Sequence, residues 1–193
     1  MYQDFLDYLK TKLQISETEF ELIQETLIHK NIKRRKFLLQ EGEIWRYYAF
    51  VLKGLLRTYS VDDRGVEHII DFSLENSWTG DMESYSSEIP SNLNIDALED
   101  SEVILISKVN FEKLLNEIPD FAKFMKKLFE ISFIESQNRV LSNISLTSEQ
   151  KYTNFLDKFQ DVHPRFPQHM IASYLGISAE TLSRIRNQNT KKI

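Results

Sequence analysis

The most constraining feature of the chain is the stretch QHMIASYLGISAETLSRIRN, residues 168–187. Its apolar residues fall at helical spacing on either side of Gly176, so each pair shares one helix face. Gly176 stands where the first helix ends and the chain turns sharply, a position that favours positive φ. Ser178 follows as an N-cap for the second helix. The spacing therefore predicts a helix-turn-helix with these inward-facing residues: Ile171, Leu175, Ile177, Leu182 and Ile185.

The second of these helices, expected at about residues 179–188, leaves a polar face outside the apolar stripe. Arginine can pair with guanine through two hydrogen bonds, and glutamate can accept one from cytosine. Arg184 and Glu180 are four residues apart, as suits a helix in the DNA major groove. The alternative is an ordinary helical hairpin in which these two residues form a solvated ion pair. We expect DNA contacts from Gln168, Ser178, Ala179, Glu180, Thr181, Ser183, Arg184, Arg186 and Asn187.

The charge is distributed unevenly along the 193 residues. Five basic residues (Arg165, Arg184, Arg186, Lys191 and Lys192) and one acid (Glu180) lie between residues 163 and 193, a net charge of +4. Because the whole chain carries −5, the remainder carries −9. A basic C-terminal module on an acidic body is typical of a protein that reads DNA.

Several function classes lack support in the sequence. The chain has no cysteine, which excludes disulfides, thiolate-bound zinc and cysteine-ligated iron–sulfur clusters. It contains no glycine-rich phosphate loop and no G-x-S-x-G or H-E-x-x-H pattern, and its four histidines are scattered. The N-terminus is an amphipathic helix rather than a signal peptide, and no run is long enough to span a membrane. We expect a cytoplasmic protein that is not an enzyme and holds no metal or cofactor.

Residues 1–107 read as two helices followed by strands. After the first helix, Ser16 and Glu19 form a capping box that opens a helix over 17–28. The basic run 33–36 is interpreted as a solvated edge. Short segments rich in β-branched and aromatic residues, separated by tight turns, then predict an antiparallel sandwich or rolled-up barrel. These segments are residues 37–40, 47–52, 55–61, 66–74, 92–100 and 103–107.

Helices return after residue 107. A short helix over 110–116 precedes a long one from Pro119 to about residue 143 that is apolar on more than one face, so it needs more than one partner. We expect the sandwich on one side and a second protomer on the other, although a helix buried wholly within one protomer remains open. The expected dimer seam is Phe121, Phe124, Leu128 and Ile131, continued by Glu135 and Asn138. Thr147 and Gln150 form a second capping box, which opens a helix to about residue 159.

A β-roll, a long helix and a C-terminal helix-turn-helix together resemble the Crp/Fnr family of bacterial transcription regulators, over nearly the whole chain. The expected fold class is α+β, with a sensor-like β-roll over 1–118, a dimerisation helix over 119–144 and a DNA-binding domain over 145–193. The resemblance implies a homodimer on a two-fold symmetric operator, effector binding in the β-roll, and contact with RNA polymerase. Its turn glycines match Gly42, Gly54, Gly65 and Gly80 here, and its recognition-helix positions match Glu180 and Arg184.

The chain departs from that family in its ligand pocket. Members that bind cyclic nucleotides carry a Gly-Glu pair and an Arg-Ser pair, whereas this chain has Gly80-Asp81 and Ser91-Asn92. No arginine or lysine lies between Arg64 and Lys108, so the cation that holds a cyclic phosphate is missing. We therefore expect no response to cyclic AMP. If a different small-molecule effector exists, it binds around Gly80, Asp81, Ser91 and Asn92.

A second departure is at the C-terminus. The family's β-hairpin wing is expected to be absent, with Lys191 and Lys192 contacting DNA phosphates instead. Ala179 stands where the family often has arginine and cannot hydrogen-bond a base, so the operator is expected to differ from those of the best-known members. The alternative function is a ligand-binding or protein-interaction module that keeps the fold without reading DNA. A regulator with no effector at all also remains open.

Overall fold

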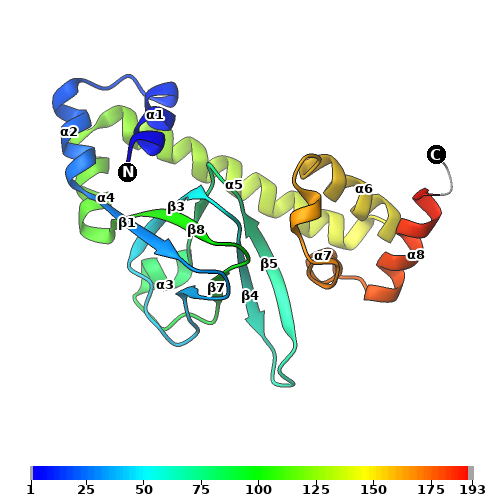
Figure 1. The fold of residues 1–193 in the computed structure, drawn as a ribbon. Helices are drawn as coiled ribbons and strands as arrows, with labels where there is room; N and C mark the ends of the chain where they lie inside the picture. The colour runs from blue at the N-terminus through cyan, green and yellow to red at the C-terminus, as the bar shows by residue number, and fades with distance from the viewer. Residues whose placement is uncertain (1, 191–193) are drawn as a thin grey trace.

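The computed structural model describes residues 2–190, which form a β-roll flanked by helices, a long helix and a small helical domain (Figure 1). The fold class predicted from the sequence is confirmed. The helices are α1 (Gln3–Lys12), α2 (Glu17–Glu25), α3 (Met82–Ser87), α4 (Lys108–Glu117), α5 (Pro119–Ser145), α6 (Ser148–Lys158), the 3₁₀ turn η1 (His163–Arg165), α7 (Gln168–Leu175) and α8 (Ala179–Thr190).

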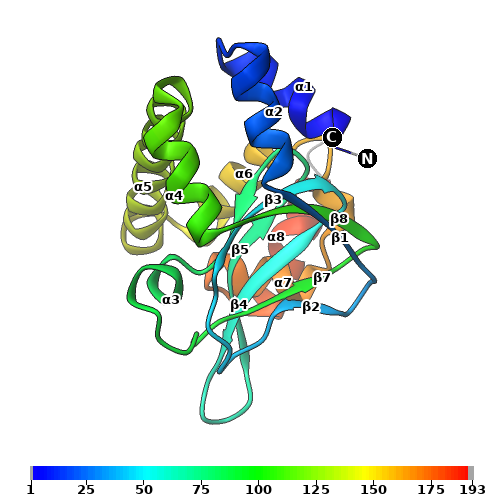
Figure 2. The same ribbon diagram turned by 90° about the vertical axis from the view of Figure 1, so that its left-hand side faces the viewer.

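Two antiparallel four-stranded sheets form the roll. The first has the order β1-β8-β3-β6 and the second β2-β7-β4-β5, so β5 is an edge strand. Figure 2 shows α1, α2, α4 and α5 gathered at one end of the roll. The strands are β1 (Leu27–Ile32), β2 (Phe37–Leu39), β3 (Tyr47–Lys53), β4 (Leu56–Val61), β5 (Glu67–Ser73), β6 (Trp78–Thr79), β7 (Asn94–Ala97) and β8 (Ser101–Ser107).

A first hydrophobic core fills the roll and extends under these N-terminal and central helices. Aromatic side chains dominate it: the ring of Phe5 lies 4.8 Å from that of Phe50, and Tyr48 stacks on Phe111 at 3.6 Å. Aromatic residues bury large apolar areas, so this core holds the flanking helices firmly against the sheets.

The helix predicted over 17–28 is wrong at its C-terminal end. The capping box of Ser16 and Glu19 is present, but α2 ends at Glu25 and β1 begins at Leu27. Leu27 pairs with Ile106 of β8, and this long-range pairing overrides the local helical pattern. The basic run 33–36 is exposed in the turn between β1 and β2, which confirms its interpretation as a solvated edge. The short elements β6 and α3 were not predicted from the sequence.

A second core joins the helical domain to the roll. It contains residues from β4 and β5, such as Tyr59, Ile69 and Phe72, together with the apolar faces of α6, α7 and α8. The ring of Phe72 lies 4.6 Å from that of Phe166, which precedes α7. The helical domain is therefore packed on the outer face of the second sheet, and its α7 lies against β5.

The first part of the expected dimer seam on α5 lies inside the protomer. Phe121 is fully buried in its own protomer, 5.6 Å from the ring of Phe111, so its assignment to a dimer contact is wrong. Phe124 and Leu128 also pack against the first core. Glu135 forms an ion pair with Lys158 of α6 at 3.3 Å, Asn138 lines a groove beside α6, and Ile131 is exposed at the side of the helix.

The opposite face of α5 is apolar and exposed. Five large apolar side chains in its C-terminal half are exposed to solvent, from 54% at Ile134 to 80% at Ile144. Periodicity alone could not distinguish this face from the inner one, because both carry apolar residues. The exposed residues on this outer face are Phe133, Ile134, Val140, Leu141 and Ile144.

Candidate nucleic-acid interface

The turn between α7 and α8 has the geometry that its sequence predicts. Gly176 adopts φ 64°, the left-handed conformation that ends a helix. Its N–H donates to Ser173 O at 3.0 Å and the next N–H, that of Ile177, donates to Ala172 O at 3.0 Å. These two bonds satisfy carbonyl groups at the end of α7 and redirect the chain into α8.

Ser178 caps the second helix, as predicted. Its Oγ accepts a hydrogen bond from Thr181 N at 3.1 Å, and its hydroxyl donates to Thr181 Oγ1 at 3.1 Å. Leu182 and Ile185 of α8 are almost fully buried with Ile171 of α7 and hold the two helices together. Burial of one face fixes which side chains of α8 point outward.

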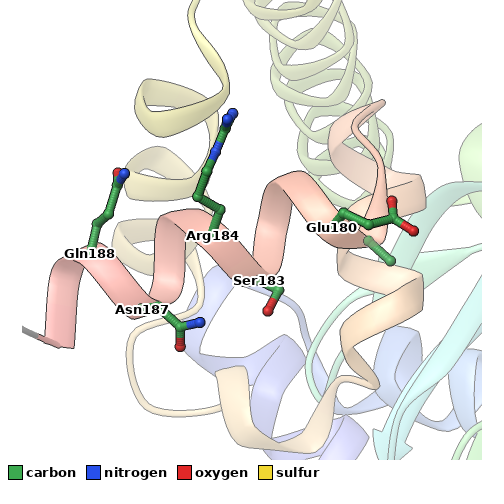
Figure 3. Close-up of a pocket in the computed structure, with 6 residues that line it drawn as sticks. Glu180, Ser183, Arg184, Asn187 and Gln188 are labelled. Carbon is green, nitrogen blue, oxygen red and sulfur yellow. The ribbon is translucent and has the colours of Figure 1, made fainter.

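The outward face of α8 carries mainly polar side chains. Six residues border one shallow, open depression: Ala179, Glu180, Ser183, Arg184, Asn187 and Gln188. In Figure 3, Arg184 and Gln188 project in the same direction, and Ser183 and Asn187 lie along the next row of the helix. This exposed helix face therefore presents both hydrogen-bond donors and acceptors, which are the groups that read base edges in the major groove.

The carboxyl of Glu180 lies at the N-terminus of α8. Its pKa is lowered, first because it accepts a hydrogen bond from its own backbone N–H and second because of Ser178. The carboxylate form is therefore the stable one and can only accept hydrogen bonds. Arg184, one turn later, only donates hydrogen bonds. The two side chains therefore offer an acceptor and a donor, respectively, to a molecule bound along α8.

The structure brings five of the nine predicted DNA contacts together on this depression: Ala179, Glu180, Ser183, Arg184 and Asn187. Ser178 and Thr181 are engaged in the cap. Arg186 is exposed on the flank of α8, and Gln168 is exposed at the start of α7. Lys191 and Lys192 lie outside the described residues. Gln188 was missed, although it follows Arg184 by four residues and its helical spacing was readable.

The second predicted site, in the β-roll, is occupied by its own side chains. The Asp81 carboxylate is buried and accepts hydrogen bonds from Glu83 N (3.0 Å), Ser84 N (3.2 Å) and Ser91 Oγ (2.6 Å). A Cβ added at Gly80 would lie 2.6 Å from Trp45 Nε1, so the indole fills the space beside that glycine. Asn92 is exposed. An anionic ligand would therefore meet a buried carboxylate here.

Other site classes find little support. Within residues 2–190, no group of three or more His, Asp or Glu side chains is placed to hold a metal ion. None of the helices that the structure describes is long and apolar enough to cross a membrane.

Known proteins resemble this chain in both sequence and fold. The family described as "Cyclic nucleotide-binding domain" matches residues 29–117. The transcriptional activator protein anr of Pseudomonas aeruginosa is 24% identical over 169 residues, which cover 80% of this chain and 67% of that protein. The regulatory protein HlyX of Actinobacillus pleuropneumoniae is 22% identical and matches 90% of this chain and 77% of its own length.

Solved structures share the fold. FixK2 from Bradyrhizobium japonicum superposes with a TM-score of 0.74 at 19% identity, over 86% of this chain and 85% of that one. The c-di-GMP-responsive global regulator CLP of Xanthomonas campestris superposes with a TM-score of 0.73 at 12% identity, over 92% and 93% of the two chains. The similarity thus extends over both the β-roll and the helix-turn-helix.

Proposed function

The chain belongs to the Crp/Fnr family of transcription regulators, and on this premise we propose that it acts as a homodimer that reads a two-fold symmetric DNA operator through α8. The observation that carries the proposal is the exposed polar face of α8, on which Glu180, Ser183 and Arg184 stand clear of the helix-turn-helix core. An interaction hairpin without DNA reading has no need of this donor and acceptor pattern.

We assign base contacts to Arg184 and Glu180 and phosphate contacts to the start of α7. Among the described residues, no side chain caps α7 at Pro167. The N–H of Met170 donates to Pro167 O at 2.9 Å, whereas those of Gln168 and His169 at the helix start are oriented to bind a phosphate oxygen. Such contacts would fix the register of the domain on DNA, while α8 supplies the sequence selectivity.

We place the dimer contact on the outer face of α5 rather than on the seam expected from the sequence. Ile134, Leu141 and Ile144 follow one another at spacings of seven and then three residues, as in the seam of a coiled coil. A contiguous exposed apolar stripe on a soluble helix marks an interaction surface. A second copy of α5 offers the same stripe and would cover it symmetrically.

Cyclic AMP is not part of the proposal. The buried carboxylate of Asp81 lies in the pocket expected from the family resemblance, and it already accepts three hydrogen bonds. Bringing a phosphate beside it would place two like charges in a partly dry site, which costs free energy unless a cation intervenes.

Selection of binding sites from a random duplex DNA pool, followed by a salt titration on the selected sequence, tests the function. We expect a two-fold symmetric site whose affinity falls steeply with salt and does not change when cyclic AMP is added. Failure to enrich any sequence, with or without cell extract, would instead favour the interaction-module alternative.

Replacing Arg184 with alanine tests the recognition face directly. We expect the Arg184→Ala protein to bind the selected operator about 1–3 kcal/mol more weakly and to lose selectivity at one base pair per half-site. Binding by parent and variant is compared on all single-base variants of the half-site. Arg64→Ala is the control, because Arg64 is exposed in the β4–β5 turn and pairs with Asp62 of the same turn. Equal selectivity in the Arg184→Ala protein and the parent would refute the assignment.

A further inference from the structure

Arg139 connects three parts of the molecule through one side chain. It belongs to α5, its Nη2 donates to Ile69 O of β5 at 3.1 Å, and its guanidinium lies 4.3 Å above the ring of Tyr174 in α7. The planar guanidinium can stack and donate at the same time, which an ammonium group cannot do equally well. The long helix, the edge of the roll and the helix-turn-helix are thus tied at one point.

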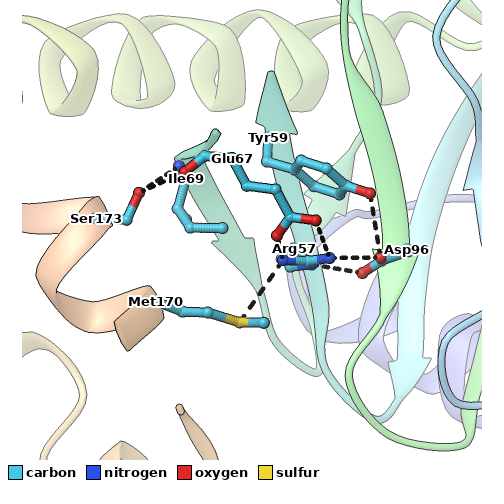
Figure 4. Close-up of polar contacts among 7 residues, drawn as sticks. All are labelled: Arg57, Tyr59, Glu67, Ile69, Asp96, Met170 and Ser173. Atoms are coloured by element: carbon cyan, nitrogen blue, oxygen red, sulfur yellow. Dashed lines mark hydrogen bonds and ion pairs between the residues drawn. The ribbon is translucent and has the colours of Figure 1, made fainter. Parts of the chain in front are cut away.

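The neighbouring residue of α7 completes this connection. Ser173 Oγ accepts from Ile69 N at 2.9 Å, and its hydroxyl donates to Glu67 O at 3.2 Å (Figure 4). β5 is an edge strand, so these backbone groups have no further strand to pair with. Side chains of α5 and α7 instead bind three of these backbone groups, namely Ile69 N–H, Ile69 O and Glu67 O.

These directional contacts lie where apolar packing is incomplete. A groove of about 480 Å³ separates α5 from α6 and α7, and Asn138, Arg139, Lys158 and Tyr174 are among the residues that line it. The second core holds the helical domain on the outer face of the sheet, but apolar contact is non-directional. Hydrogen bonds and ring stacking restrict the angle between α7 and α5, since both depend on orientation.

We propose that Arg139, acting through Tyr174, is a positioning residue that sets the separation of the two recognition helices and hence the half-site spacing of the operator. The inference rests on the proposed function, because it assumes a dimer that reads DNA. Two recognition helices must lie about 34–36 Å apart to enter successive major grooves on one side of the duplex. A small rotation of the helical domain about its apolar contact would move α8 in both protomers and change that separation.

The test measures binding to operators whose central spacer is shortened or lengthened by one base pair. Each step shifts the half-sites by about 3.4 Å and about a tenth of a turn, so we expect the parent to lose about tenfold in affinity. In the Arg139→Gln protein we expect this loss to shrink to about threefold or less, while selectivity for the half-site bases is unchanged. Tyr174→Leu should behave in the same way, and Tyr174→Phe, which keeps the ring, should resemble the parent.

Hydrogen exchange of the Ile69 amide gives a second readout that needs no DNA. Because this N–H donates to Ser173 of the helical domain, its protection reports whether α7 is docked at the fixed angle. We expect faster exchange at Ile69 in the Arg139→Gln protein, with unchanged exchange at Val103 in the centre of the first core. A purely structural role would accelerate both amides, and Arg64→Gln is the matched control.

The outcomes separate the two proposals. If the parent binds no symmetric operator, the proposed function fails. If the parent shows a sharp spacer preference and Arg139→Gln shows the same preference, the function stands and the positioning role of Arg139 is overturned. Equally weakened affinity of Arg139→Gln for every operator, with the parent's spacer preference intact, would likewise overturn it.

Discussion

Asp81 illustrates how a single residue can change what a ligand-binding fold is able to hold. Its carboxylate caps α3 and is bridged to Ser91, so three donors converge on one buried charge. A buried carboxylate is tolerated only when its oxygens are hydrogen-bonded. The donors that satisfy Asp81 are then not available to a phosphate, and the pair is better understood as a structural link between α3 and the loop before β7.

Replacing Ser91 with alanine should therefore affect stability rather than ligand response. Removing the donor at 2.6 Å leaves one oxygen of Asp81 without that partner, and we expect the free energy of unfolding to fall by about 1–3 kcal/mol. Urea denaturation measures this loss, and Ser86→Ala on the exposed side of α3 is the control. Cyclic AMP should shift the melting temperature of neither protein. An unchanged free energy of unfolding in Ser91→Ala would show that the bridge contributes nothing.

At the scale of the element, α5 carries two apolar faces, one buried in the protomer and one exposed to solvent. Phe121 and Met125 complete the core of the protomer, while Ile134, Leu141 and Ile144 are exposed on the other side. A helix with such a stripe is unstable alone in water, and a symmetric partner would remove the stripe from solvent.

A charge placed in the centre of this stripe should prevent dimer formation. We expect Leu141→Asp to be a folded monomer, because burying an unpaired carboxylate in a helix seam costs several kcal/mol. Sedimentation or light scattering measures the mass, and circular dichroism checks the fold. Val109→Asp adds the same charge at a valine that is 76% exposed on α4 and should leave the dimer intact. A dimeric Leu141→Asp protein would move the interface elsewhere.

At the scale of the whole molecule, the helical domain contacts the β-roll at further points away from Arg139. In addition to the shared second core, Arg57 is paired with Asp96 through two hydrogen bonds of 2.8 and 2.9 Å and touches Met170 of α7 (Figure 4). Arg165 of η1 reaches back to the roll and binds both Glu75 and Glu99 through paired hydrogen bonds of 2.8–3.0 Å. The link between α6 and α7 is therefore anchored to two turns of the roll.

The Arg165 contact should make stability depend on acid pH. The guanidinium of Arg165 lowers the pKa of Glu75 below its usual 4.5 in the folded protein. A carboxyl with a depressed folded pKa stabilises fully above its unfolded pKa, and this contribution is lost as pH falls below about 4.5. Arg165→Gln should lower the free energy of unfolding by about 1 kcal/mol at pH 7 and weaken its pH dependence below 4.5.

Urea denaturation from pH 7 to pH 3 provides the measurement for this pair. Lys123→Gln, which removes an exposed ion pair with Asp120, is the control and should keep the parent's profile. Identical pH profiles for Arg165→Gln and the parent would show that the contact does not couple to acid stability.

The sequence by itself determined what depends on neighbours along the chain. The capping boxes at Ser16 and Thr147, the left-handed Gly176 and the inward residues of the helix-turn-helix were predictable, because each rests on hydrogen bonds or periodicity within a few residues. For the same reason the outward face of α8 could be predicted nearly completely, with only Gln188 missed.

Only the tertiary structure decided which residues far apart in sequence meet. Residues 27–32 form a strand because they pair with β8. Phe121 is buried against Phe111 inside the protomer, whereas Leu141 of the same helix is exposed. The contacts of Arg139 with β5 and α7 join residues separated by tens of positions, and no local pattern encodes them. Long-range packing chooses among faces and conformations that local preferences leave nearly equal in free energy, so these choices appear only in the folded chain.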